Sequence, residues 1–330
     1  MRALVGGAAP DWEVRDVDVP APGPGQILVR VHAAGLNRAD LYMLEGAYSP
    51  STKTGHVYVA GIELAGEVEG AGSDVRDLAV GDRVMGSTLG AFAPFAVLDH
   101  RHAIAVPGSL GWIVAAALPV GLSTEHDALV TQGGFSAGDS VLIVGATSSV
   151  GLMGIQLAKA LGAGLVIGTT TSDEKASRLT DAGADLVVNT KTDSLVEKVT
   201  EATGGAGVDI ALDHVGGQLF ADLLPATRIG GMIVNIGRLA GPVSTINLDQ
   251  LSFRRLRVRG TTFSVRTPEE RGEVCAALVP DVLPAVAEGR IRPLVDRVFA
   301  FDDAREAANY MRSNQAVGKI VLELPEGAAP

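Results

Sequence analysis

The first hundred or so residues alternate short apolar or β-branched segments with turn residues. Examples are residues 27–31, 66–69 and 82–85, each bounded by Gly, Pro or Asp. Segments of this length between turn residues are typical of strands. The pattern predicts a β-barrel, with the Pro- and Gly-rich residues 20–25 as an exposed connector.

From Gly138 onward, strand-like runs alternate with amphipathic helical segments. Residues 141–144 and 165–167 are continuous apolar runs, as strands buried on both faces require. Further runs follow at 186–188, 210–212, 232–236 and 256–260. Six strands in this alternation predict a parallel, doubly wound sheet with right-handed crossovers, which is an α/β fold.

The remaining tail predicts helices through 282–288 and 304–311 and a final strand at 319–324. We expect that strand to return to the first domain. A chain of 330 residues, 47% of them hydrophobic, is long enough for two cores. We therefore expect a barrel domain of residues 1–120, completed by 266–330, and a nucleotide-binding domain of residues 121–265.

Charge and cysteine content exclude several classes of function. The 27 Lys and Arg residues against 38 Asp and Glu give a net charge of −11, which repels nucleic acids and anionic membranes. The single cysteine, Cys275, permits neither an internal disulfide nor a cysteine-based zinc cluster. The apolar run 141–167 is broken by glycines and carries Lys159, and the N-terminal apolar stretch is too short for a secretory signal. We expect a soluble cytoplasmic protein with no nucleic-acid or membrane partner.

The segment Gly145–Gly151 leaves a predicted buried strand and opens a helix predicted over 152–161. Small residues at such a turn let backbone N–H groups and the positive end of the helix meet a pyrophosphate. Against the dinucleotide-binding fingerprint it reads Ala146-x-Ser148-x-x-Gly151, so two of the three glycines are replaced. A tight turn without a ligand is the alternative interpretation.

The end of the second predicted strand selects between nicotinamide cofactors, because an acidic residue there binds the ribose of NAD. This chain has Thr169-Thr170-Thr171-Ser172, followed by Lys175 and Arg178. Hydroxyls and cations suit a 2′-phosphate, so NADPH is favoured. Asp173 and Glu174 lie close by, and we interpret them as residues of a helix N-terminus.

Taken together, these features make the chain resemble the medium-chain dehydrogenase/reductase superfamily, and specifically its zinc-independent quinone oxidoreductase branch. The motifs that carry the resemblance are residues 34–40 (AGLNRAD), 61–68 (GIELAGEV), 81–84 (GDRV), 146–151 and 317–322 (VGKIVL). The resemblance implies a GroES-like β-barrel, a Rossmann domain and an active site in the cleft between them.

Zinc-dependent members of this superfamily hold a catalytic zinc through Cys and His. The corresponding positions here are Asn37, Ile62 and Val120, none of which binds zinc, and no cysteine lies between Val84 and Ile104 for a structural zinc. We expect no metal. Without a Lewis acid an isolated ketone is hard to reduce, whereas a quinone or an enone gives a delocalised enolate that hydrogen bonds stabilise.

The resemblance also assigns individual site residues. Asn37, Tyr42 and Tyr48 match the residues that line the acceptor pocket, where Asn37 would donate to a carbonyl oxygen and a tyrosine hydroxyl to the enolate; packing of Tyr42 on the barrel is the alternative. Asp40 is expected to be a turn or cap residue. The residues expected to contact the cofactor are Thr124, Ala146, Ser148, Ser149, Val150, Gly151, Thr170, Thr171, Ser172, Lys175, Ile236, Gly237 and, on a strand over 260–263, Phe263.

Other positions depart from the family pattern. Glu125-His126-Asp127 places acidic groups and a histidine at the domain junction, which predicts a hydrogen-bonded interdomain network or a proton relay. Thr190 and Asn314 replace a Tyr and an Arg of some relatives, and His214 replaces a small residue near the pyrophosphate. On a strand Arg255, Arg257 and Arg259 share one face, which predicts an edge guard or a subunit contact.

The sequence therefore predicts an NADPH-dependent reductase of quinones or α,β-unsaturated carbonyls that works without zinc. The resemblance implies a homodimer joined through the last Rossmann strand. Two alternatives stay open, a zinc-independent alcohol or ketone dehydrogenase and a non-catalytic nucleotide-binding protein. The acceptor and the proton donor are not specified by the sequence.

Overall fold

A computed structural model describes residues 1–7, 10–46 and 56–325, and the chain divides into two compact units. Unit 1 contains residues 1–120, 263–279 and 293–330, and unit 2 contains residues 121–262 and 280–292. The division differs from the expected one at residues 263–265, which belong to unit 1, and at residues 280–292, which belong to unit 2. The helix predicted at 282–288 is the end of a longer helix, α9 (Pro268–Ala287), which contains Pro280 and Pro284. Prolines normally end helices, so the pattern underestimated its length.

Unit 1 is built from mainly antiparallel sheets, in which one pair of strands at the edge of the larger sheet is parallel. The three-stranded sheet has the order β2 (Glu13–Asp16), β1 (Arg2–Gly6), β4 (Tyr58–Val59). The larger sheet has the order β15 (Val295–Ala300), β16 (Lys319–Glu323), β3 (Gln26–Leu36), β5 (Leu64–Ala71), β6 (Arg83–Gly86), β8 (Ala103–Ala105), and β7 (Phe95–Asp99) also pairs with β3. Because β16 pairs with β3, the expected return of the final strand to the first domain is confirmed.

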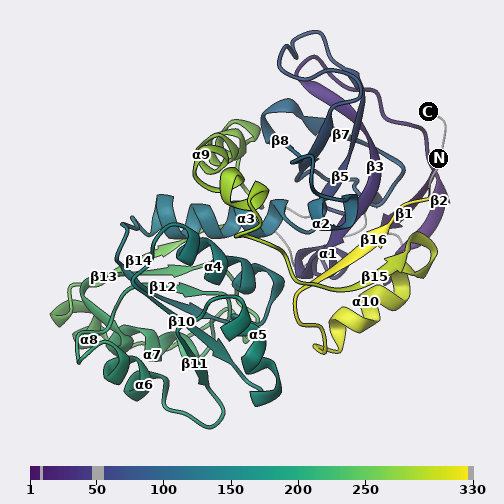
Figure 1. Cartoon of the computed structure of the whole chain (residues 1–330). Helices are drawn as coiled ribbons and strands as arrows, with labels where there is room; N and C mark the ends of the chain where they lie inside the picture. Colours follow the sequence, from purple (N-terminus) through teal and green to yellow (C-terminus); the bar gives the residue numbers. More distant parts are fainter. Residues whose placement is uncertain (8–9, 47–55, 326–330) are drawn as a thin grey trace. The chain divides into compact units, whose positions relative to one another are not determined.

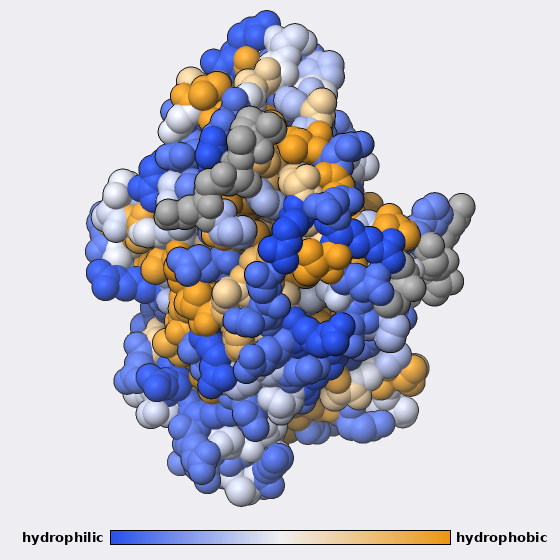
Figure 2. All heavy atoms as spheres, turned by 90° about the vertical axis from the view of Figure 1, so that its right-hand side faces the viewer, coloured by the Kyte–Doolittle hydropathy of each residue, from blue (hydrophilic) through white to orange (hydrophobic). Residues whose placement is uncertain are grey.

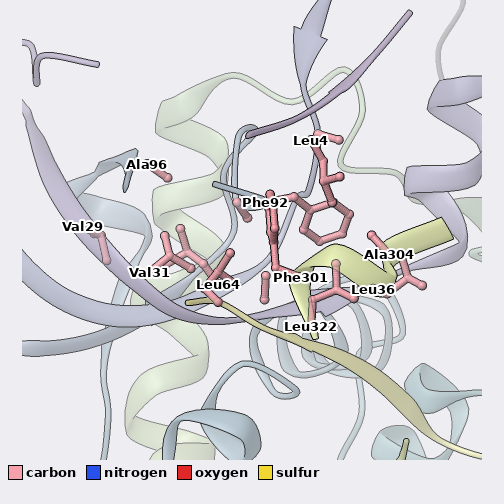
Figure 3. Close-up of a cluster of buried hydrophobic side chains, with 14 of the residues drawn as sticks. Leu4, Val29, Val31, Leu36, Leu64, Phe92, Ala96, Phe301, Ala304 and Leu322 are labelled. Carbon is pink, nitrogen blue, oxygen red and sulfur yellow. The ribbon is translucent and has the colours of Figure 1, made fainter. Parts of the chain in front are cut away.

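The core of unit 1 follows from the alternation of apolar residues along β3. Ile27, Val29, Val31 and Ala33 are buried, and the residues between them are half-buried. Figure 3 shows how side chains of β1, β3 and β16 gather with Phe92 in one apolar cluster. The helices of this unit include α1 (Arg38–Leu44), α2 (Trp112–Ala115) and α10 (Ala304–Arg312), the last at the predicted place.

Unit 2 contains the predicted six-stranded parallel sheet. Its order is β11 (Leu186–Asn189), β10 (Leu165–Thr170), β9 (Ser140–Val144), β12 (Val208–Asp213), β13 (Thr227–Asn235), β14 (Arg257–Gly260). The helices that accompany it are α4 (Ser149–Ala160), α5 (Ala176–Asp181), α6 (Leu195–Ala202), α7 (Leu219–Ala226) and α8 (Leu248–Phe253) (Figure 1). The central strand β9 is buried from Val141 to Val144, which its unbroken apolar run requires. The predicted fold class, a GroES-like barrel domain with a Rossmann domain, is confirmed.

One helical stretch, Trp112–Gln132, is long and apolar enough to cross a membrane by length and composition alone. It includes α2, α3 (Pro119–His126) and a π-helical turn over Asp127–Gln132. Most of it, 72% of its most apolar window, is buried within the protein, as is usual for a core helix. The face in Figure 2 is mainly hydrophilic, with groups of apolar residues interspersed.

Candidate functional site

The turn between β9 and α4 is closed by a serine hydroxyl. Ser148 caps α4: its Oγ accepts a hydrogen bond from Gly151 N at 3.0 Å and donates one to Gly145 O at 2.9 Å. Gly145 has a φ of +80°, which favours glycine there. The hydroxyl of Ser148, which replaces a glycine of the fingerprint, is thus hydrogen-bonded within the turn. A ligand would therefore be bound by the backbone of the turn.

Backbone N–H groups at the start of α4 remain open. Among the described residues, neither Ser149 N nor Val150 N has a hydrogen-bond partner. A methyl group at residue 151 would lie 2.6 Å from Ala146 Cα, so only glycine allows α4 to begin this close to the buried Ala146. Open donors at the positive end of a twelve-residue helix suit a pyrophosphate, and the residues present fit a dinucleotide.

Just after β10, the acidic side chain of Asp173 is bonded to the neighbouring strand. Asp173 Oδ1 accepts a hydrogen bond from Asn189 Nδ2 at 2.7 Å, at the end of the adjacent β11. Thr170 is buried and bonds to both backbone groups of Ser172. Thr171 is exposed, and Lys175 is half-buried on the short helical turn that follows. Thr170 is one of the residues predicted to contact the 2′-phosphate, and in this structure its hydroxyl stabilises the turn.

The end of β13 carries two further predicted cofactor residues. Ile236 N and Gly237 N both donate to Asp213 O, at 2.8 and 3.0 Å. The prediction of a strand over 260–263 is wrong, because β14 ends at Gly260. Phe263 lies beyond it in unit 1, where its carbonyl accepts a hydrogen bond from the Arg271 guanidinium.

Each residue of the cluster 125–127 contacts a side chain elsewhere in the chain. Glu125 contacts His214, His126 Nε2 lies 2.9 Å from Asp281 Oδ2, and Asp127 accepts a hydrogen bond from Thr261 Oγ1 at 2.8 Å. Every one of these residues belongs to unit 2. These contacts join elements within the nucleotide-binding unit, and the interdomain network predicted for the cluster stays a prediction. Thr124, which precedes the cluster, is half-buried on α3.

In unit 1 a buried lysine stands beside Asn37. Lys319 Nζ donates to Asn37 Oδ1 at 2.7 Å and forms an ion pair with Glu63 Oε2. Asn37 Nδ2 donates to Glu63 Oε2 at 3.0 Å and to Gly35 O at 3.2 Å, and Val120 N donates to Glu63 Oε1 at 2.7 Å. Both amide protons of Asn37 are thus already donated. The donation to a substrate carbonyl that the sequence predicts requires one of these bonds to break.

The backbone explains how the ammonium reaches this place. The antiparallel register pairs Ile320 of β16 with Leu36 of β3, so Lys319 lies opposite Asn37. A methyl group at Gly35 would lie 2.3 Å from Glu63 Oε2 and 2.7 Å from Lys319 Cε, so glycine makes room for the ion pair. Neither Glu63 nor Lys319 was assigned a role from the sequence, although a charged residue within an apolar strand motif indicates a buried partner.

The other predicted acceptor residues lie on or near α1. Asp40 caps α1 by accepting a hydrogen bond from Asn37 N at 2.8 Å, which confirms its expected role. Burial raises the pKa of Asp40 to about 7, and burial together with the charge of Asp40 raises the pKa of Tyr58 to about 12. Tyr42 is half-buried, and its hydroxyl has no hydrogen-bond partner among the described residues. Tyr48 lies outside the described residues.

The environment of Asn37 does not suit a zinc ion. Asn37, Ile62 and Val120 stand at the positions where the resemblance implies zinc ligands, and an ammonium group bonds to the Asn37 oxygen. Within the described ranges no group of three or more His, Cys, Asp or Glu side chains could hold a metal ion. We derive no step through a metal.

Comparison with known proteins assigns the chain to a family. Residues 23–108 match the profile of the alcohol dehydrogenase GroES-like domain, and residues 149–278 match that of the zinc-binding dehydrogenases. A quinone oxidoreductase of Pseudomonas aeruginosa is 33% identical over 317 residues, 94% of each chain. The chain belongs to the quinone oxidoreductase family.

Solved structures agree with this family assignment. An Escherichia coli quinone oxidoreductase complexed with NADPH superposes with a TM-score of 0.85 at 27% identity, over 98% of this chain and all of the other. An NAD-dependent alcohol dehydrogenase superposes with a TM-score of 0.84 at 30% identity, over 98% of this chain and all of the other. Like other quinone oxidoreductases, the chain is an oxidoreductase with a nucleotide-binding fold that acts on a small molecule.

Proposed function

We propose that the protein is an NADPH-dependent reductase of quinones or α,β-unsaturated carbonyls that works without zinc. The observation that carries the proposal is the hydrogen bond from the buried Lys319 ammonium to Asn37, at the position of a zinc ligand. A site without a Lewis acid favours acceptors whose negative charge spreads on reduction. The relatives named quinone oxidoreductase support the same acceptor class.

In the proposed reaction, the cofactor supplies a hydride and the acceptor takes it at a conjugated carbon. The loop 145–151 binds the pyrophosphate through the open N–H groups of Ser149 and Val150. The acceptor oxygen receives a hydrogen bond from Asn37 when the longer Asn37–Gly35 bond breaks. A developing oxyanion is a stronger acceptor than the neutral Gly35 carbonyl, so this exchange becomes favourable as the charge grows. Tyr42, whose hydroxyl is uncommitted in the described chain, is the second proposed donor.

The test of this function is a screen of quinones and enones with NADPH and with NADH, followed by product analysis. We expect the C=C bond of an enone to be reduced and its C=O bond to persist. Exclusive formation of an alcohol from a saturated ketone would favour the alcohol dehydrogenase alternative, for which the NAD-dependent structural neighbour is the argument. Tight NADPH binding without turnover of any acceptor would favour a binding protein.

The proposed absence of zinc gives a first prediction. The purified protein should contain no zinc, because Asn37, Ile62 and Val120 cannot ligate it and Lys319 supplies a cation beside Glu63. Elemental analysis after dialysis is the measurement, and added chelator should leave the rate unchanged. About one zinc per chain, retained on dialysis, would refute the prediction.

Preference for NADPH gives a second prediction. Lys175→Ala should weaken NADPH binding by about 1–2 kcal/mol, the size of one charge-assisted hydrogen bond, and leave NADH binding nearly unchanged. Thr171, Ser172 and Lys175 supply hydroxyls and a cation after β10, and Asp173 is bonded to Asn189. Calorimetric titration with both cofactors measures the change. Lys191→Ala, which removes an exposed lysine after β11, is the matched control. Equal losses for both cofactors would show that Lys175 does not contact the 2′-phosphate.

We also propose a homodimer joined through β14. This strand is the edge of the six-stranded sheet, and its four residues are exposed, including the apolar Val258. An exposed strand edge is a template for pairing with a second chain. The expected result is a particle of twice the chain mass by light scattering, and a monomer at all concentrations would refute it.

A further inference from the structure

A buried acid and a buried histidine meet beside the carboxyl ends of β9 and β12. Glu125 on α3 is fully buried, and His214, directly after β12, is 5% exposed. His214 Nε2 lies 2.5 Å from Glu125 Oε1. The proposed reaction does not use this pair.

The partners of His214 determine where its protons lie. Nδ1 is 2.9 Å from Val144 O, and a carbonyl oxygen only accepts, so Nδ1 carries a proton. A second proton lies between Nε2 and Glu125. Burial by itself lowers the pKa of His214, but the charge and hydrogen bond of Glu125 outweigh it, and the pKa is raised. Asp213 contributes in the same direction.

The carboxylate of Glu125 depends on this histidine. Glu125 Oε2 is buried and has no hydrogen-bond partner among the described residues. A methyl group at Gly154 of α4 would lie 2.3 Å from that oxygen, so the carboxylate is pressed against the helix backbone. His214 is the cation that compensates it. Loss of the shared proton would leave a buried charge facing a nitrogen lone pair, which is costly in a low-dielectric interior.

The pair joins the segments to which we assign the cofactor. Glu125 follows Thr124 on α3, and Val144, which accepts from His214, precedes the loop 145–151. A methyl group at Gly237 would lie 2.3 Å from His214 O, so the segment after β13 rests on the histidine backbone. Contacts from α3, β9 and the end of β13 therefore meet at one histidine.

We infer that Glu125 and His214 are positioning residues: their shared proton holds the three cofactor segments together and makes NADPH affinity depend on pH. The inference rests on the proposed function, because NADPH is the ligand assigned to these segments. The titratable groups that face His214 are Glu125 from α3 and Asp213 from β12. Helix α4 presents Gly154 and strand β9 presents the Val144 carbonyl, so neither adds a charge there.

The direction of the pH dependence follows from the raised pKa. The pair is intact below the ordinary pKa of histidine and loses its proton as the pH rises through the raised value. NADPH should therefore bind more weakly on the alkaline side, by about tenfold if one charge-assisted hydrogen bond is lost. The contribution of the pair to folding stability should fall over the same alkaline range.

Glu125→Gln is the test variant. The glutamine amide can donate a hydrogen bond to neutral His214, so the variant keeps the contact and removes the charge of the carboxylate. Calorimetric titration with NADPH and no acceptor should show about tenfold weaker binding at neutral pH and no further alkaline loss. Asp281→Asn is the matched control: it alters the neighbouring His126–Asp281 contact, also within unit 2, and should keep the wild-type pH profile. The inference would be overturned if Glu125→Gln still lost NADPH affinity at alkaline pH as the wild type does. It would also be overturned if Asp281→Asn no longer showed that loss.

A second measurement needs neither cofactor nor variant. Proton NMR of the wild-type protein should show an imidazole N–H resonance far downfield of the backbone amides, lost as the pH rises and missing from Glu125→Gln. Its absence in the wild type at neutral pH would overturn the inference even if Glu125→Gln does not fold. Failure of NADPH to bind at any pH would refute the proposed function, and the resonance and the alkaline loss of stability would still test the pair.

Discussion

Lys319→Met should lower the free energy of unfolding of unit 1 by about 3–5 kcal/mol, the usual cost of removing one partner from a buried ion pair. The side chains of Lys319 and Glu63 are 2% and 0% exposed, so water does not replace the lost ammonium. The variant leaves a buried carboxylate whose remaining donors among the described residues are the Asn37 amide and the Val120 N–H. Both tryptophans, Trp12 and Trp112, belong to unit 1, so tryptophan fluorescence in a denaturant titration reports on this unit.

Two further variants make this measurement specific. Arg312→Met removes the cation of a partly exposed ion pair with Asp11, also in unit 1, and it should cost about 0–1 kcal/mol in the same titration. Adding Glu63→Gln to Lys319→Met removes the uncompensated charge and should restore much of the lost stability. A cost below about 1 kcal/mol for Lys319→Met would mean that Lys319 does not compensate the charge of Glu63.

Asn37→Ala should lower kcat by about 100- to 1000-fold, because one lost donor to a developing oxyanion costs about 2.7–4 kcal/mol. KM should change less, since the exchange of the Gly35 carbonyl for the acceptor oxygen becomes favourable only as charge develops. NADPH affinity should stay at the wild-type value, because the loop and strand ends assigned to the cofactor belong to unit 2. Steady-state kinetics with the best quinone or enone, beside a calorimetric NADPH titration, measure all three quantities.

The tyrosines provide the comparison for Asn37. Tyr42→Phe and Tyr48→Phe should lower kcat only a few-fold, because water can replace a phenolic hydroxyl. Asn37 also bonds to Lys319 and Glu63, so the fluorescence titration must show that Asn37→Ala is folded under assay conditions. Full activity of the Asn37→Ala, Tyr48→Phe double variant with every accepted quinone and enone would show that these side chains only pack in the barrel.

The fold was predictable because its pattern is local. The unbroken apolar run of β9 indicates a strand buried on both faces, and the alternation along β3 indicates a strand buried mainly on one face. Six strand-like segments separated by helical segments, as in unit 2, are compatible with few sheet topologies. The length of α9 was not predictable from the same rules, because Pro280 and Pro284 normally stop a helix. The end of β14 at Gly260, before Phe263, was not predictable either, because strand ends depend on tertiary pairing more than on composition.

The candidate site was predictable only in part, because its key contacts join distant residues. The turn Gly145–Gly151 is contiguous, so its residue types indicate its role. The bond from Lys319 to Asn37 spans most of the chain and arises from the register of β16 on β3, which no local motif specifies. The contact of Glu125 with His214 is similar: the two residues are 89 positions apart, and only the fold makes them partners.

Synthesis on the ribosome adds a time order to the position of Lys319. Asn37, Glu63 and Val120 emerge first, and their ammonium partner follows roughly 200 residues later, a delay of about 10–40 s at about 5–20 residues per second. Through that interval Glu63 has no internal cation, and the edge of β3 that β16 will cover is unpaired. A nascent chain stalled before residue 319 should therefore contain a folded unit 2 sheet and an incomplete barrel.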